Sequence, residues 1–237
     1  MTAAELELSF LRLYDKVTNL AAPGYEQEEI QLFLNKAQLQ AVKHRYNYKG
    51  NKYREGVEAT EKRRKDLSEL VRGVDLSASS NNSDQTGVFP NGVFFDLPTD
   101  FLYTLMEEVT ISHTNACFDG NRISVKPITH DEYNSNVKNP FKKPNEELVW
   151  RLDFSHDIVN GTPELRHELV TDADTAVTTY HVRYIKLPTD IDLVNNITSE
   201  LHEAMHEEIV DIAVRIATGI TDPQAYQIKA NEESLTE

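Results

Sequence analysis

The sequence has a single cysteine, Cys117, among its 237 residues. One thiol cannot close an intrachain disulfide or build a cysteine metal cage, so we expect a protein made in a reducing compartment. No apolar run approaches the roughly 20 residues that cross a bilayer, and no membrane contact is expected. The opening residues, MTAAELELSF, lack a basic segment followed by an apolar stretch, so we expect no secretory signal.

Basic charge is also scarce. The chain has 24 Lys and Arg against 39 Asp and Glu, a net charge of −15. A surface this acidic repels phosphates, which excludes a protein that grips nucleic acid over its whole surface. The same acidity suits the wall of a conduit through which DNA slides. There is no phosphate-binding glycine loop and no G-x-S-x-G nucleophile motif, and we expect no cofactor.

The patterns that are present change twice along the chain. Apolar residues at three- and four-residue steps predict helices over residues 3–20, 25–47 and 52–72. Alternating apolar residues predict strands over 93–98, 101–112, 122–128, 148–155, 167–171 and 176–188, with Glu107 interrupting the apolar face of the second. Residues 129–147 read as a long surface loop. Helical periodicity returns over 196–217, and Asp222-Pro223 opens a short last helix.

This order predicts an α+β fold. Residues 1–76 and 191–237 would form an antiparallel helical bundle, completed by the C-terminal helix. Residues 92–190 would be an antiparallel β module inserted into it, after a polar linker over 77–91.

One short motif has two interpretations: a zinc-peptidase site or a coincidental match to its signature. His202, Glu203 and His206 spell H-E-x-x-H, the zinc-peptidase signature. On a helix, histidines four residues apart can share a metal while the glutamate polarises the bound water. This pattern keeps a zinc metallohydrolase as a remote alternative.

Three observations favour chance. The predicted helix over 196–217 has its own apolar stripe, and both histidines lie at the flank of that stripe. Glu207 and Glu208 directly follow the motif, where a buried peptidase helix normally has no charge. The extended signature needs Gly at 209 and His at 212, and both positions are Ile. We therefore interpret the motif as accidental, and expect no metal site and no catalytic residue.

Two segments are candidate interaction sites. Residues 129–147 contain Phe141, Lys142 and Lys143, an apolar anchor with basic flanks that suits an acidic neighbour. A solvated loop is an equally good interpretation. Tyr133 in the same segment is a further candidate. Arg63 and Arg64 belong to a short basic run that could contact a phosphate or a partner, although a solvated helix face explains such a run more often.

Several phrases together resemble a known family. They are LPTDFLYTLMEEVTI (97–111), VKPITHDEYNSNVKNPFKKP (125–144), WRLDF (150–154), TTYHVRYIKLPTDIDL (178–193) and MHEEIVDIAVRIATG (205–219). In this order they resemble the virion structural proteins of crAss-like phages, tailed phages that infect Bacteroidota. The family's last helix has a similar H-E-E-I-V pattern, which explains the second half of the zinc-like motif.

The resemblance implies a non-enzymatic ring or adaptor protein of the head-to-tail connector, below the portal. It implies a cyclic homo-oligomer of about twelve copies, matching the portal. Its partners would be the portal, neighbouring ring or tail proteins, and genomic DNA passing through the channel without sequence-specific binding. Such a protein would be assembled in the host cytoplasm and end in the virion. A tail-hub component or another virion interaction module is the alternative.

Overall fold

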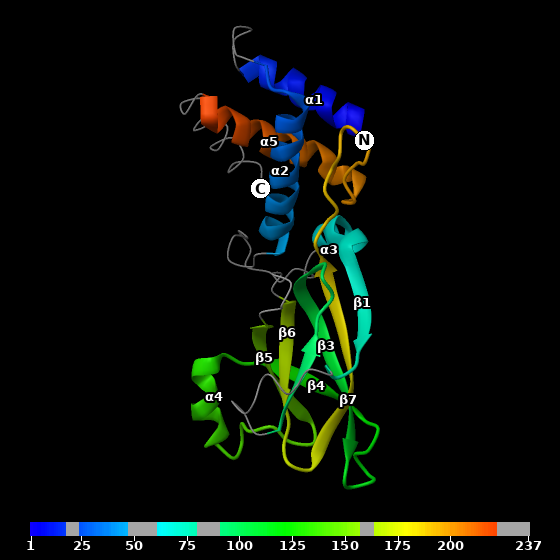
Figure 1. Cartoon of the computed structure of the whole chain (residues 1–237), viewed down its shortest axis with the longest axis vertical. Helices are drawn as coiled ribbons and strands as arrows, with labels where there is room; N and C mark the ends of the chain where they lie inside the picture. The colour runs from blue at the N-terminus through cyan, green and yellow to red at the C-terminus, as the bar shows by residue number, and fades with distance from the viewer. Residues whose placement is uncertain (18–23, 47–60, 80–90, 157–163, 222–237) are drawn as a thin grey trace. The chain divides into compact units, whose positions relative to one another are not determined.

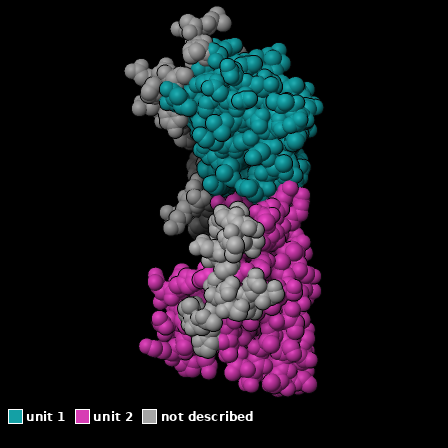
Figure 2. All heavy atoms as spheres, in the orientation of Figure 1, with its two compact units in different colours: residues 1–70, 187–237 teal, residues 71–186 magenta. Residues whose placement is uncertain are grey.

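The computed structural model describes residues 1–17, 24–46, 61–79, 91–156 and 164–221 (Figure 1). The chain divides into two compact units, coloured separately in Figure 2. The first unit combines both ends of the chain, residues 1–70 and 187–237, and the second is the continuous stretch 71–186. Over the described ranges, no helix has the length and apolar character needed to cross a membrane.

The first unit is helical. Its helices are α1 (Ala3–Val17), α2 (Gln27–Tyr46), α3 (Glu61–Leu67) and α5 (His206–Thr221), with 3-10 turns at Ser68–Leu70 and Glu203–Met205. Figure 1 shows α2 crossing α1 and α5 rather than running beside them. The predicted antiparallel bundle is therefore not confirmed, although α5 does contact both N-terminal helices.

An aromatic cluster holds α1, α2 and α5 together. The Phe10 and Phe33 rings lie 6.2 Å apart between centroids, and the Tyr25 ring lies 5.0 Å from Phe33. The Tyr25 hydroxyl donates a hydrogen bond of 3.2 Å to the Ala217 carbonyl on α5. Each ring buried here contributes about 2 kcal/mol to folding, so packing rather than helix propensity sets this arrangement.

Polar side chains on α2 hold the segment that returns from the sheet. Asn35 makes two bonds with Ile191: its Oδ1 accepts from the backbone N–H at 2.7 Å, and its Nδ2 donates to the carbonyl at 3.1 Å. Gln38 donates to the Thr189 carbonyl, and Gln31 accepts from the Leu193 N–H. These side chains share one helix face at four- and three-residue steps, so residues 189–193 are held against α2.

The second unit is a curled, seven-stranded mixed sheet that forms a half-barrel. Its strands are β1 (Val71–Leu76), β2 (Gly92–Asp96), β3 (Phe101–His113), β4 (Arg122–Pro127), β5 (Leu148–His156), β6 (Glu164–Val170) and β7 (Thr175–Lys186). Their order is β1-β7-β3-β4-β5-β6-β2. The β3–β7 register shifts at three places, and such irregularities bend a strand and increase its twist.

The larger apolar core lies on one face of the sheet. It contains buried residues from six strands: Phe95, Val109, Ile111, Ile123, Val149, Leu169, Tyr180, Val182 and Tyr184. A second cluster combines Ile128, Tyr133, Trp150, Leu152 and Val170, and α4 (His130–Val137) contributes Tyr133 to it. The strands are thus buried on both faces near β5 and β6.

Four predictions about the elements need correction. The prediction of an entirely antiparallel module is wrong because β4 and β5 are parallel, joined by α4 as a crossover. The predicted loop over 129–147 contains that helix. The helix predicted over 52–72 is described only from residue 61, and its end is wrong: residues 71–76 form β1 on the sheet edge. The helix predicted over 196–217 begins only at His206. The last helix and most of the linker lie outside the described residues.

Candidate functional site

The α4–β5 connection presents the first candidate. Thr129 caps α4, accepting a hydrogen bond from the Glu132 N–H at 3.3 Å, and the helix ends at Val137. The chain then turns through residues 139–143, which we name the Phe141 turn. This turn follows a crossover helix whose position is fixed by packing on the sheet.

Local hydrogen bonds give the Phe141 turn its shape. The Asn139 side-chain oxygen accepts from the Phe141 N–H at 3.0 Å. The Asn139 carbonyl accepts from the N–H groups of Lys142 and Lys143 at 3.0 and 3.2 Å. The Phe141 side chain is nevertheless 95% exposed, more than any other large hydrophobic residue in the described ranges. A hydrogen-bonded turn that holds a phenylalanine in solvent, beside two exposed lysines, is organised for contact rather than for folding.

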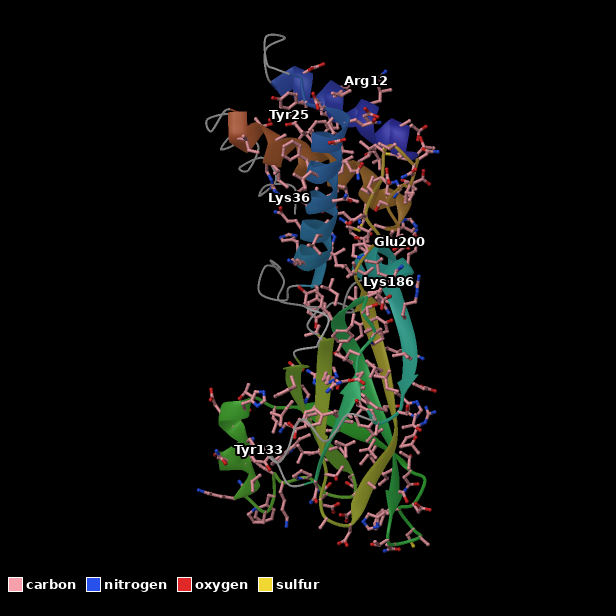
Figure 3. The ribbon with its side chains drawn as sticks, in the orientation of Figure 1. Arg12, Tyr25, Lys36, Tyr133, Lys186 and Glu200 are labelled. Atoms are coloured by element: carbon pink, nitrogen blue, oxygen red, sulfur yellow. The ribbon has the colours of Figure 1, made fainter. Side chains whose placement is uncertain are left out.

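Tyr133 has a different role. Its side chain faces the sheet and is 7% exposed, and its ring lies 5.8 Å from the Trp150 ring in an edge-to-face contact (Figure 3). Burial of the hydroxyl raises the pKa of Tyr133. Of the predicted interaction residues, Tyr133 therefore packs in the core and anchors α4.

The basic run lies on α3. Arg64 is exposed on this seven-residue helix, between the exposed Lys62 and Lys65. The Arg63 side chain lies outside the described part of the structure. Asp66, on the other side of α3, is buried and pairs with Arg45 of α2 at 3.2 Å. The structure thus presents Arg64 to solvent.

The H-E-x-x-H segment is not one helix. His202 precedes the 3-10 turn Glu203–Met205, and α5 starts at His206. The expected geometry, with both imidazoles on adjacent turns of an α-helix, is therefore absent, and the predicted amphipathic helix through this segment is wrong. His202 instead acts as a cap, its Nδ1 accepting from the Ala204 N–H at 3.2 Å. Glu203 is exposed.

His206 is buried and used structurally. Its Nε2 lies 3.0 Å from the Leu201 carbonyl, to which only a protonated nitrogen can donate. Its Nδ1 lies 2.9 Å from the Met1 backbone nitrogen. Burial lowers the pKa of His206, although the hydrogen bond to Leu201 acts in the opposite direction. No set of three or more His, Cys, Asp or Glu side chains in the described ranges is arranged to hold a metal ion.

A polar network links the strands of the sheet, and Glu107 is its only member that stood out in the sequence. The Tyr180 hydroxyl donates to Glu107 at 2.7 Å and lies 2.8 Å from His167 Nδ1. Arg151 pairs with the other Glu107 oxygen and lies 3.3 Å from Asp153, which in turn lies 3.4 Å from His167 Nε2. The five side chains form a closed loop that links β3 and β7 to β5 and β6; Asp153 closes it at the surface, because its side chain is 76% exposed, and the other four are largely buried.

This network is built to stabilise the sheet rather than to transfer protons at neutral pH. Burial, with a smaller effect from the Arg151 charge, lowers the pKa of His167 to about 3. Burial and the adjacent Glu107 carboxylate raise the pKa of Tyr180. A general base works best with a pKa near the operating pH, and neither group meets that condition. In the sequence, the only sign of this network was Glu107 on the otherwise apolar face of a predicted strand.

Comparison with known proteins decides the family. A model of the phage tail ring protein 3/4 family matches residues 1–231. The chain belongs to this family. Ring protein 4/5 of Bacteroides phage crAss001 is 30% identical over 234 residues, 92% of each chain. Ring protein 3 of the same phage is 28% identical over 222 residues, 88% of this chain and 90% of its own length.

The resemblance to crAss-like phage virion proteins is thus confirmed, and the chain is a structural component of a phage virion. Both relatives are named as ring proteins. The tail ring protein family match covers both compact units, including the Phe141 turn and the H-E-x-x-H segment.

Proposed function

We propose that this tail ring protein forms a closed ring of identical subunits in the head-to-tail connector, below the portal. About twelve copies would surround the conduit through which genomic DNA leaves the head. The observation that carries this proposal is the match to the tail ring protein family over nearly the whole chain. The portal, neighbouring ring proteins and the passing DNA are the expected partners.

The chain's own chemistry supports this role. A subunit of a closed ring needs two different surfaces, one for each neighbour, and two units of different architecture supply them. Its net charge of −15 disfavours tight contact with DNA phosphates, so DNA would move past the ring without sticking. Phe141, Lys142 and Lys143 are the foremost candidates for a contact with an acidic neighbour, and Arg64 is a secondary one.

Placement in the connector can be tested on assembled particles. An epitope-tagged copy of the protein, incorporated into virions and labelled with gold, should place the label at the junction of head and tail. Labels at the far end of the tail would instead support a tail-hub component, and labels over the capsid shell would contradict both assignments.

The proposed role has no chemical step. Glu203→Gln should therefore leave particle assembly and infectivity unchanged, and a zinc chelator should have no effect on either. A loss of infectivity in the Glu203→Gln virions, reproduced by chelator in the wild type, would instead support metal chemistry at residues 202–206.

A further inference from the structure

The connection between β6 and β7 is short for the distance that it spans. Residues 171–174 join these two strands, although β3, β4 and β5 lie between them in the sheet. Four residues can make this connection because the sheet curls, and Figure 1 shows them at one end of the sheet. We name residues 171–175 the β6–β7 turn.

Both sides of the β6–β7 turn are tied to other strands. The Thr171 N–H donates to the Asn91 carbonyl at 3.4 Å, and the Thr114 N–H donates to the Asp174 carbonyl at 3.3 Å. Thr175, the first residue of β7, is 6% exposed, and Val177 packs against the larger apolar core. Side chains two residues apart on a strand share a face, so the Thr175 hydroxyl points to the side of the sheet that carries this core.

Two side-chain oxygens of this turn are buried and form no hydrogen bond with any described residue. They are Oγ1 of Thr175 and Oδ1 of Asp172. Buried polar atoms without a partner are rare in folded proteins because their lost hydration is not replaced, so a pair of them three residues apart needs an explanation. Asp174 adds an exposed carboxylate between them. No Lys or Arg occurs over residues 167–182 to neutralise these acids locally.

These donors are all oxygens, and such a set suits a hard divalent cation. The turn has no His or Cys, the ligands that favour zinc and copper. Calcium accepts about six to eight oxygen ligands in flexible geometry, whereas magnesium requires a near-ideal octahedron and keeps more of its water. The turn offers two carboxylates rather than three or more His, Cys, Asp or Glu side chains, so a hydroxyl, backbone carbonyls and water would complete the coordination.

We propose that the β6–β7 turn binds one calcium ion through the carboxylates of Asp172 and Asp174 and the hydroxyl of Thr175. The ion would give both buried oxygens a partner and offset two negative charges of an acidic chain. It would also link the end of β6 to the start of β7, two strands that do not pair with each other. This site is distinct from the H-E-x-x-H segment, and it does not depend on the proposed ring function.

Equilibrium dialysis with radiolabelled calcium tests the site on the full-length protein, after removal of bound metal with a chelator. Asp172→Asn and Thr175→Val each remove one ligand and keep the shape of the side chain. Asp190→Asn is the matched control, because Asp190 is an exposed aspartate outside the turn. We expect one calcium per wild-type chain and per control chain. Loss of one ligand should weaken the affinity by at least about tenfold, and magnesium should compete poorly.

Thermal melting of Thr175→Val gives a second readout. Without calcium, this variant should melt at or above the wild-type temperature, because an apolar group of the same shape replaces a buried hydroxyl that has no partner. Calcium at a hundred times its Kd should raise the wild-type melting temperature by about 5 °C and leave the variant nearly unchanged. A hydroxyl with only a structural role would not produce this reversal.

Three results would overturn the proposal. The wild type could show no saturable calcium binding, which would mean that the two buried oxygens hold no ion. Binding could persist in both Asp172→Asn and Thr175→Val, which would place the ion elsewhere. Uptake of several ions, reduced equally by Asp190→Asn, would show diffuse attraction to the acidic surface instead of a site.

Discussion

His167 and Glu168 predict an unusual pH dependence of stability. They are consecutive on β6, so their side chains point to opposite faces of the sheet, and both are buried. Burial, with a smaller effect from the Arg151 charge, lowers the pKa of His167 to about 3. Burial raises the pKa of Glu168 to about 7, with His130 acting in the opposite direction. The two shifts have opposite consequences as the pH falls.

The sign of each effect on stability depends on whether the folded or the unfolded chain binds the proton more tightly. Between pH 6.5 and about 3, an unfolded chain protonates His167 while the folded chain does not, so stability falls as pH falls through this window. At pH 5 this loss is about 2 kcal/mol relative to pH 8. Between about pH 7 and 4.5, the folded chain protonates Glu168 while the unfolded chain does not, so stability rises as pH falls. In the wild type these effects oppose each other.

Single substitutions separate the effects of His167 and Glu168 on stability. His167→Gln should make the second unit more stable at pH 5 than at pH 8, because only the Glu168 effect remains. Glu168→Gln should make it less stable at pH 5 by about 2 kcal/mol, because only the His167 effect remains. Urea unfolding followed through the single tryptophan, Trp150, measures this unit directly. His44→Gln, in the first unit, is the control.

The burial argument would be refuted if both variants kept the wild-type difference between pH 5 and pH 8. It would also be refuted if both changed in the same direction, because the two pKa shifts have opposite signs.

Three further predictions concern packing and polar contacts. Arg151→Met should destabilise the second unit by about 3–5 kcal/mol, since it leaves the Glu107 carboxylate buried without its cation, and adding Glu107→Leu should restore much of the loss in denaturant unfolding. Asn35→Ala should cost about 1–3 kcal/mol because the Ile191 N–H and carbonyl both lose their partner, and hydrogen exchange at Ile191 should accelerate while the sheet amides stay protected. Gly92→Ala should cost about 1–3 kcal/mol, because a methyl group there would lie 2.2 Å from a Glu168 side-chain oxygen; a second change, Glu168→Ala, should relieve the clash, and thermal melts that show no relief would contradict this reason.

The strands that were predicted correctly share strong alternation of apolar residues. β3, β4, β5 and β7 lie close to their predicted bounds, because burial of one face imposes a period of two on the sequence. β1 was missed because its sequence, VRGVDL, contains a glycine and two charged residues and directly follows a helix. Its place on the sheet edge comes from pairing with β7, about a hundred residues later, which no local pattern reveals.

Helix ends were harder to predict where distant contacts set them. The periodicity over 196–217 gives no sign that α5 starts only at His206. Residues 192–197 instead form a turn closed by the bridge between Asp192 and Ile197, and His202 caps the 3-10 turn Glu203–Met205 that precedes α5. By contrast, α4 had a local signal that was overlooked: Thr129 followed by Glu132 is a capping pattern.

The candidate site was visible in the sequence only as composition. An aromatic residue between a proline and two lysines predicted Phe141, Lys142 and Lys143 as a contact, and the structure shows that all three are exposed. Tyr133 could not be separated from them, because its burial depends on Trp150 in a strand that lies beyond the turn.

Native mass spectrometry of the full-length protein tests the central claim most directly. We predict a single closed oligomer of about twelve copies with few intermediates, since closure satisfies both surfaces of every subunit. A monomer at all concentrations, or an open series of oligomers without a preferred size, would contradict the assignment of this chain as a self-assembling ring subunit.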